Sequence, residues 1–83
     1  MTPHEWTAQA ERHLRKLSLP IQREIIDKLE YFLHAPEPLR FAEPLVGRRG
    51  KLYRFRVRDY RLIVELTNGK LLILAVGRRD KIY

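Results

Sequence analysis

The second half of the chain is a series of short apolar runs separated by tight turns. Residues 52–58 alternate between bulky apolar side chains and arginine, the period-two pattern of a strand with one buried face. Residues 60–66 and 71–76 are two further runs rich in branched and aliphatic residues. Asn68-Gly69 stands between them and favours a two-residue hairpin, because both central positions need positive φ. Arg58-Asp59 predicts another tight turn, so the three runs form an antiparallel meander.

The first half of the chain has the period of amphipathic helices. Apolar side chains recur at helical spacing in two stretches, formed by Ala10, Leu14 and Leu17 and then by Ile21, Ile25, Leu29 and Leu33, widened by Ile26 and Phe32. Ser18 and Pro20 separate the stretches, because serine is a favoured helix cap and proline fits a first helical turn. Pro36 follows the second stretch, so we expect this helix to end near His34 or Ala35.

These patterns predict an α+β fold in one domain that covers residues 1–83. Two antiparallel helices joined by a tight turn form a helical hairpin, which packs on one face of a twisted antiparallel β-sheet. Residues 5–7 indicate a short additional edge strand with Trp6 in the core. Residues 35–50 are punctuated by prolines and glycines, so we expect an ordered loop of functional importance there.

The composition limits the classes of function. Lysine and arginine number 17 against 10 aspartates and glutamates, which gives a formal net charge of +7. The chain has no cysteine, which excludes disulfide scaffolds and cysteine-based zinc sites. It contains no run of about 18 apolar residues and no secretory signal, so we expect a cytoplasmic protein without a membrane partner. The excess of positive charge predicts a polyanion or an acidic protein as the partner.

The register of the first hairpin decides where its arginines lie. If Arg58-Asp59 are the turn residues, Arg56 lies opposite Arg61, and Arg54 shares their face. Two arginines directly across a strand pair repel each other unless an anion lies between them. A solvated outer face also suits arginine, and this simpler interpretation stays open. The clustering, together with Gly77-Arg78-Arg79 at the end of the last run, favours an anion-binding site.

Other chemical motifs are weaker. His4, His13 and His34 have no partner at metal-ligand spacing, so we expect no metal site and assign most of them to the surface. The order of residues contains no glycine-rich phosphate loop and no Ser/His/Asp set. Glu43 is either a loop carboxylate without a role or a general base beside the basic face.

Three segments carry a resemblance to a known family. They are Tyr-Arg-Phe-Arg-Val at 53–57, Asp-Tyr-Arg-Leu-Ile at 59–63 and Val-Gly-Arg-Arg-Asp-Lys-Ile-Tyr at 76–83, and they resemble the RelE/ParE superfamily of type II toxins. The family fold is a helical hairpin on a twisted antiparallel sheet, in agreement with the patterns above. RelE-like members are ribosome-dependent endoribonucleases that cut mRNA in the decoding site. They use no metal or other cofactor and leave a 2′,3′-cyclic phosphate and a 5′-hydroxyl.

The resemblance implies a role for each matching residue. Arg54 and Arg56 occupy the positions of two basic strand residues of the RelE-like active site, and Arg61 that of the arginine holding the scissile phosphate. Arg79 matches the basic residue after the last strand, and Tyr83 the C-terminal tyrosine that stacks on an mRNA base. The further residues expected to contact RNA are Arg58, Arg78 and Lys81. These roles suit the chemistry, because guanidinium forks match phosphate oxygens and an aromatic ring orients a base.

The general base needs a residue other than arginine. RelE itself carries lysine at the positions of Arg54 and Arg56, whereas the arginine guanidinium stays protonated in proteins. YoeB-like members use a glutamate in a Glu-Pro-Leu loop, which resembles Glu43-Pro44-Leu45 here. That likeness makes Glu43 a candidate base, with Arg79 or Lys81 supplying the proton, or its electrostatic equivalent, to the leaving oxygen.

The resemblance also implies partners and alternatives. A cognate antitoxin with an acidic, partly disordered segment is expected to wrap the toxin, and the ribosome and mRNA are its expected targets. Two other functions stay open. The ParE branch inhibits DNA gyrase, and a catalytically weakened toxin acts only as a binding module. The basic set favours the ribonuclease, because a gyrase inhibitor has no need of it.

Overall fold

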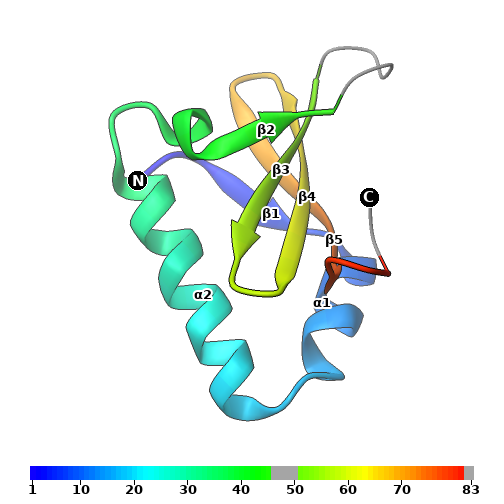
Figure 1. Ribbon diagram of the computed structural model, residues 1–83. Helices are drawn as coiled ribbons and strands as arrows, with labels where there is room; N and C mark the ends of the chain where they lie inside the picture. Colours follow the sequence, from blue (N-terminus) through cyan, green and yellow to red (C-terminus); the bar gives the residue numbers. More distant parts are fainter. Residues whose placement is uncertain (46–50, 82–83) are drawn as a thin grey trace.

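The computed structural model describes residues 1–45 and 51–81 of the chain. Its elements are, in order, β1 (His4–Trp6), α1 (Ala8–Arg15), α2 (Leu19–His34), the 3-10 helix η1 (Pro38–Phe41), β2 (Ala42–Pro44), β3 (Leu52–Val57), β4 (Tyr60–Thr67) and β5 (Lys70–Arg78). Figure 1 shows the strands in the middle of the molecule, with α2 along one side and α1 below. The predicted α+β fold is confirmed.

Both helices begin and end close to the predicted positions. The Thr7 hydroxyl caps α1 by accepting a hydrogen bond from the Ala10 N–H at 3.1 Å. Ser18 precedes α2 as predicted, although its side chain makes no capping hydrogen bond, and Pro20 lies in the first turn. The helix ends at His34, directly before the proline-rich segment. In the described part of the chain, no helix has the length and apolar character needed to cross a membrane.

The five strands form one sheet in the order β1-β5-β4-β3-β2. The predicted meander is confirmed, because β3, β4 and β5 pair antiparallel in sequence order. The first strand is present as predicted, but it runs parallel to β5, so the sheet is mixed and not wholly antiparallel. A three-residue strand carries no sequence pattern for its partner. A parallel pair needs a long connection between its strands, and both helices lie in the chain between β1 and β5.

The segment expected to be a loop contains two short elements. Pro38–Phe41 forms η1, and Ala42–Pro44 pairs with β3 as the edge strand β2. The loop prediction was therefore wrong for residues 38–44, because elements of three or four residues are too short to show a period. Pro44 lies at the end of the edge strand, where its missing N–H removes no interior ladder bond.

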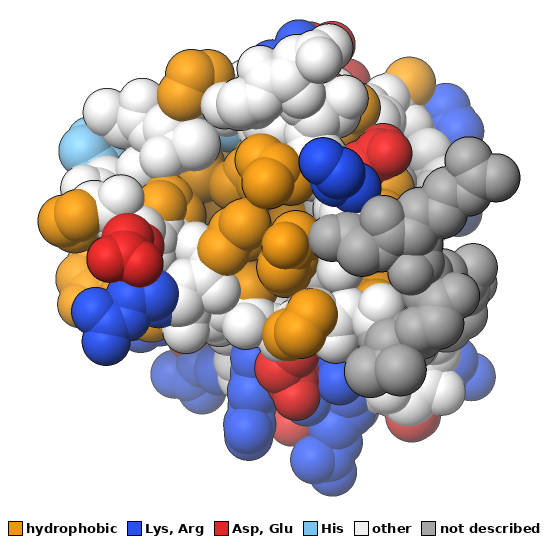
Figure 2. All heavy atoms as spheres, turned by 90° about the horizontal axis from the view of Figure 1, so that it is seen from above, with side chains coloured by type: hydrophobic (Ala, Val, Ile, Leu, Met, Phe, Trp, Pro, Cys, Tyr) orange, Lys and Arg blue, Asp and Glu red, His pale blue; other side chains and the backbone are white. Residues whose placement is uncertain are grey.

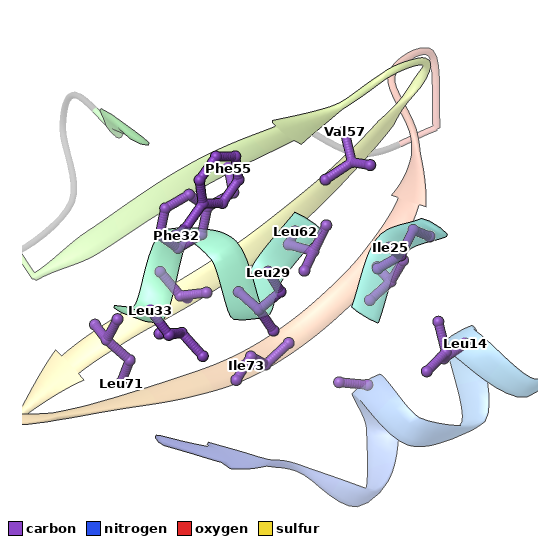
Figure 3. Close-up of a cluster of buried hydrophobic side chains, with 13 residues drawn as sticks. Leu14, Ile25, Leu29, Phe32, Leu33, Phe55, Val57, Leu62, Leu71 and Ile73 are labelled. Atoms are coloured by element: carbon purple, nitrogen blue, oxygen red, sulfur yellow. The ribbon is translucent and has the colours of Figure 1, made fainter. Parts of the chain in front are cut away.

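The hydrophobic core lies between the two helices and one face of the sheet. Phe55 and Leu62 are fully buried on that face and meet the apolar stripe of α2 (Figure 3). Val64 is fully buried in the same cluster. The core residues contributed by the helices are Ala10, Leu14, Ile25, Leu29, Phe32 and Leu33. Trp6 packs against this core, as predicted. Ile26 is 37% exposed, so its assignment to the buried stripe was wrong, since its neighbour Ile25 takes the inward direction.

Helix α1 covers the part of β5 that β1 leaves unpaired. The Thr7 hydroxyl donates to the carbonyl oxygen of Ile73 at 2.9 Å, and the Gln9 amide donates to that of Leu74 at 3.0 Å. The Val76 N–H donates to Nδ1 of His13 at 3.1 Å. The assignment of His13 to the surface was therefore incomplete, because its half-buried ring extends the hydrogen bonding of the sheet edge.

Both predicted turns are present, and both contain positive φ angles. Asn68 has φ of 50° and Gly69 has φ of 73°, as a type I′ hairpin turn requires. Arg58, in the turn between β3 and β4, has φ of 54°. A bulge between Ile63 and Val64 shifts the β4–β5 register, which increases the local twist of the sheet.

The Gly69→Ala variant is expected to lower the free energy of unfolding by about 1 kcal/mol. The added methyl group meets no atom within 4 Å, so the expected loss comes from the positive φ alone. Urea denaturation followed by circular dichroism measures the change. The matched control is Lys70→Ala, one residue further along in β5, where φ is not positive. Equal stability of Gly69→Ala and the unmodified protein would contradict the prediction.

Candidate functional site

The predicted arginine cluster lies on the face of the sheet that points away from the helices. The hairpin register is as predicted, with Arg56 opposite Arg61 and Arg54 opposite Ile63. Neighbouring core residues Phe55 and Val57 point to the other face, so the alternation of β3 directs its arginines outward. Gly77 of β5 is the partner of Arg61 and adds no side chain beside it. The register thus gathers three cations at one end of the outer face.

The side chain of Arg61 is held by the backbone of its own turn. Its Nη1 donates to the carbonyl oxygens of Arg58 and Tyr60, both at 3.0 Å. Within residues 1–45 and 51–81, no carboxylate lies at ion-pair distance from Arg56 or Arg61. The repulsion between these two guanidinium groups is therefore not offset by a described acidic side chain, and their charge is available to an anion.

Strand β2 brings a carboxylate to the same face. Glu43 is the register partner of Arg54, and its Oε1 lies 3.1 Å from Nη2 of Arg54. The carboxylate side chain is 66% exposed, and that of Arg54 is 26% exposed. An ion pair this open contributes at most about 1 kcal/mol to stability. Strand β2 therefore places the Glu43 carboxylate beside the arginine cluster.

Arg54 also carries an unsatisfied donor. Its Nε is buried and has no hydrogen-bond partner within the described residues. A buried N–H without an acceptor costs about 1–3 kcal/mol, so such groups in a folded protein call for an explanation.

The site residues predicted near the end of the chain lie close to the turn between β3 and β4. The Arg79 N–H donates to the carbonyl oxygen of Asp59 at 2.8 Å, which ties the segment after β5 to the β3–β4 turn. Nε of Arg78 lies 3.7 Å from Oδ1 of Asp80, and Cζ of Arg78 lies 5.9 Å from the centre of the Tyr60 ring. Arg79 and Lys81 are exposed, and Arg58 pairs with Glu24 of α2. Tyr83 lies outside the described residues.

A groove of about 570 Å³ that the sequence did not reveal borders the cluster. It runs between α2 and the end of β3, and its lining residues are Glu24, Asp27, Lys28, Tyr31, Arg56, Val57 and Arg58. Tyr31 is 61% exposed and belongs to an aromatic series that continues through Phe32 to the buried Phe55. In the sequence, Tyr31 is only an aromatic residue beside the apolar stripe of a helix. Such residues are common on helix surfaces and do not predict a groove.

One face of the molecule carries an apolar area close to basic side chains. Figure 2 shows an apolar area in the middle of one face, with Lys and Arg side chains gathered along its lower edge. The large hydrophobic residues with high exposure are Met1, Leu19, Ile26, Tyr31 and Phe41. In the described ranges, no three His, Asp or Glu side chains are grouped closely enough to hold a metal ion.

Comparison with known proteins identifies relatives over nearly the whole chain. The model of the family described as the ParE toxin of the type II toxin-antitoxin system, parDE, matches residues 4–83. Among curated proteins, no sequence matches this chain. The toxin–antitoxin complex RelBE2 from Mycobacterium tuberculosis matches with a TM-score of 0.77 and 26% identity, covering 96% of this chain and 93% of the other.

Two further solved structures are similar to this chain. The archaeal RelE–RelB complex from Pyrococcus horikoshii OT3 matches with a TM-score of 0.75 and 26% identity, covering 99% of this chain and 100% of the other. The chromosomal ParDE system from P. aeruginosa has a TM-score of 0.74, covering 94% of this chain and 96% of the other. Its 13% identity supports only the fold. The protein belongs to the ParE toxin family within the RelE/ParE superfamily and is a toxin of a type II toxin–antitoxin system.

Proposed function

We propose that this toxin is a metal-independent endoribonuclease that cuts ribosome-bound mRNA. One observation carries the proposal: Glu43 lies beside Arg54 on the same sheet face as the facing pair Arg56 and Arg61. A carboxylate next to several cations suits attack by a ribose 2′-hydroxyl on the adjacent phosphate. That reaction needs a base for the hydroxyl and positive charge around the phosphorane.

The reaction would proceed in one displacement. The 2′-oxygen forms a bond to phosphorus, and its proton passes to the Glu43 carboxylate. The bond from phosphorus to the 5′-oxygen breaks, and that oxygen receives a proton from the Lys81 ammonium group. The products are a 2′,3′-cyclic phosphate and a 5′-hydroxyl, so no water is consumed, and the scheme assigns no step to a metal.

Each cation has a separate role in this scheme. Arg56 and Arg61 hold the oxygens of the scissile phosphate, because the planar guanidinium binds two oxygens in parallel. Arg79, tied to the β3–β4 turn through its N–H, adds charge near the leaving group. Arg58 and Arg78 bind flanking phosphates at the rim, and Tyr83 stacks on a base of the mRNA.

The protein partner would be an antitoxin with an acidic segment. The solved RelBE2 and archaeal RelE–RelB relatives are toxin–antitoxin complexes, which supports a partner of this class here. Arg56 and Arg61 have no described carboxylate partner within this chain, so acidic side chains of the antitoxin would neutralise them and block the RNA site.

Inhibition of DNA gyrase is the second candidate function. It is favoured by the match to the ParE family model over residues 4–83. A toxin that has lost its activity and only binds its partner is a third candidate, since arginine stands at two positions where RelE itself carries lysine. Neither alternative uses Glu43 as a base, so Glu43 discriminates them from the ribonuclease.

Two assays with the purified protein test the proposal. In a translation reaction, the unmodified toxin is expected to cut ribosome-bound mRNA and leave cyclic phosphate ends, while gyrase supercoiling continues. The Arg61→Ala/Arg79→Ala double variant should cut at least about a hundredfold more slowly. Arg40→Ala, an exposed arginine of η1, is the matched control and should cut normally. Inhibition of gyrase without any RNA cleavage would contradict the proposal.

A further inference from the structure

The ion pair between Glu43 and Arg54 uses only one of the two donors on one edge of the guanidinium group. The carboxylate contacts Nη2 through one oxygen at 3.1 Å, and Nε has no partner within the described residues. The Nε–H and one N–H of Nη2 point in the same direction, which is the edge of the guanidinium that binds two oxygens at once. One of the two donors on this edge is therefore occupied and the other is free.

The free donor is also closed off from solvent. The accessible surface of Nε is below 1 Å², whereas the Glu43 side chain is 66% exposed. An oxyanion cannot reach both donors while Glu43 remains in place. A rotation of the exposed Glu43 side chain away from Nη2 would free the second donor of this edge.

We propose that Glu43 occupies the phosphate fork of Arg54 in the free toxin and leaves it when RNA binds. The ligand is an RNA phosphodiester, whose two non-bridging oxygens satisfy both Nε and Nη2. The displaced carboxylate stays on the outer face, because the β2–β3 pairing fixes its backbone opposite Arg54. Binding of the phosphate and release of Glu43 are then one event.

A phosphodiester fits this site better than a single carboxylate does. Arg56 lies two residues further along β3, on the same face, with Arg61 as its partner on β4. Successive phosphates of one strand can therefore contact Arg54 and the pair Arg56 and Arg61. This inference rests on the proposed ribonuclease function and adds that the base becomes available only when the substrate has taken its place on Arg54.

Binding of a non-cleavable RNA tests the inference. The probe is a 2′-O-methyl RNA oligonucleotide, which lacks the attacking hydroxyl, measured by fluorescence anisotropy at constant ionic strength. Glu43→Gln removes the internal competitor and is expected to bind this RNA about fivefold more tightly than the unmodified toxin. In an Arg54→Lys background the same change should give less than half of that gain, because lysine has no fork.

The matched control is Glu65→Gln, a carboxylate of the same sheet face that makes no described ion pair. Its gain should be smaller than that of Glu43→Gln and equal in both backgrounds, since it acts only through net charge. Inorganic phosphate added to the unmodified toxin should shift the Arg54 Nε–H signal in the NMR spectrum. An unchanged signal, or a Glu43→Gln gain that persists in Arg54→Lys, would overturn the inference.

Cleavage assays of the same variants separate this inference from the proposed function. Tighter binding by Glu43→Gln with normal cleavage supports the fork and refutes Glu43 as the base. Lost cleavage with unchanged binding supports the base and refutes the fork. An oligoglutamate peptide that gains more affinity from Glu43→Gln than the RNA does would refute the assignment of the site to a phosphodiester.

Discussion

The Arg61→Ala variant is expected to cut ribosome-bound mRNA about a hundred to a thousand times more slowly than the unmodified toxin. The reason is that Arg61 is held in place before any ligand arrives, through the carbonyl oxygens of Arg58 and Tyr60. A preorganised cation stabilises the developing charge on the phosphorane without the cost of reorienting during the reaction. Single-turnover cleavage of mRNA in purified ribosome complexes measures this rate.

The thermal stability of the Arg61→Ala variant should change far less than its cleavage rate. Arg56 lies directly across from Arg61, so removing one guanidinium relieves a repulsion between like charges. The variant also loses the two hydrogen bonds to the carbonyl oxygens of Arg58 and Tyr60, so its melting temperature is expected to stay within a few degrees of that of the unmodified protein. Arg61→Lys keeps the charge but loses the fork, and it should cut at an intermediate rate. Full activity of Arg61→Ala would contradict its role at the scissile phosphate.

The Phe55→Ala variant is expected to lose about 3–5 kcal/mol of unfolding free energy. Phe55 is fully buried, and its ring stacks on Phe32 at a centroid distance of 4.9 Å and an interplanar angle of 13°. Truncation removes this buried ring and leaves a cavity between α2 and the sheet. A domain of this size has a total stability of only about 5–15 kcal/mol, so the loss is a large fraction of it.

Urea denaturation at equilibrium measures the effect of Phe55→Ala. Phe55→Leu keeps most of the buried volume and should lose less, which keeps the prediction testable if the alanine variant does not fold. The matched control is Tyr31→Ala, at the exposed end of the same aromatic series, with an expected loss below about 1 kcal/mol. Equal losses at the two positions would show that the stack does not anchor α2 to the sheet.

Phe55 also links stability to the candidate site. Its neighbours in β3 are Arg54 and Arg56, whose side chains point to the other face. The packing of one ring under α2 therefore fixes the directions of two candidate RNA-binding side chains. The RNA affinity of Phe55→Leu, corrected for the fraction of protein that is folded, should be lower than that of the unmodified toxin.

Much of the fold could be predicted because its signals are local. Asn68-Gly69 and Arg58-Asp59 set two hairpin turns, and a two-residue turn determines the register of every residue pair in its hairpin. The facing positions of Arg56 and Arg61 followed from that rule and are confirmed. The parallel pairing of β1 and the strand β2 could not be predicted, because short segments have no period and their partners are distant in sequence.

The same distinction between local and long-range signals applies to the candidate site. By itself, the sequence determined that Arg54, Arg56 and Arg61 share one face, since alternation along a strand and a tight turn are properties of neighbouring residues. Only the tertiary structure decided that Glu43 lies opposite Arg54, that the Nε of Arg54 is buried without a partner, and that α2 forms a groove beside Arg56. Those three facts depend on contacts between elements far apart in the chain, which the packing of the whole core fixes and no local pattern encodes.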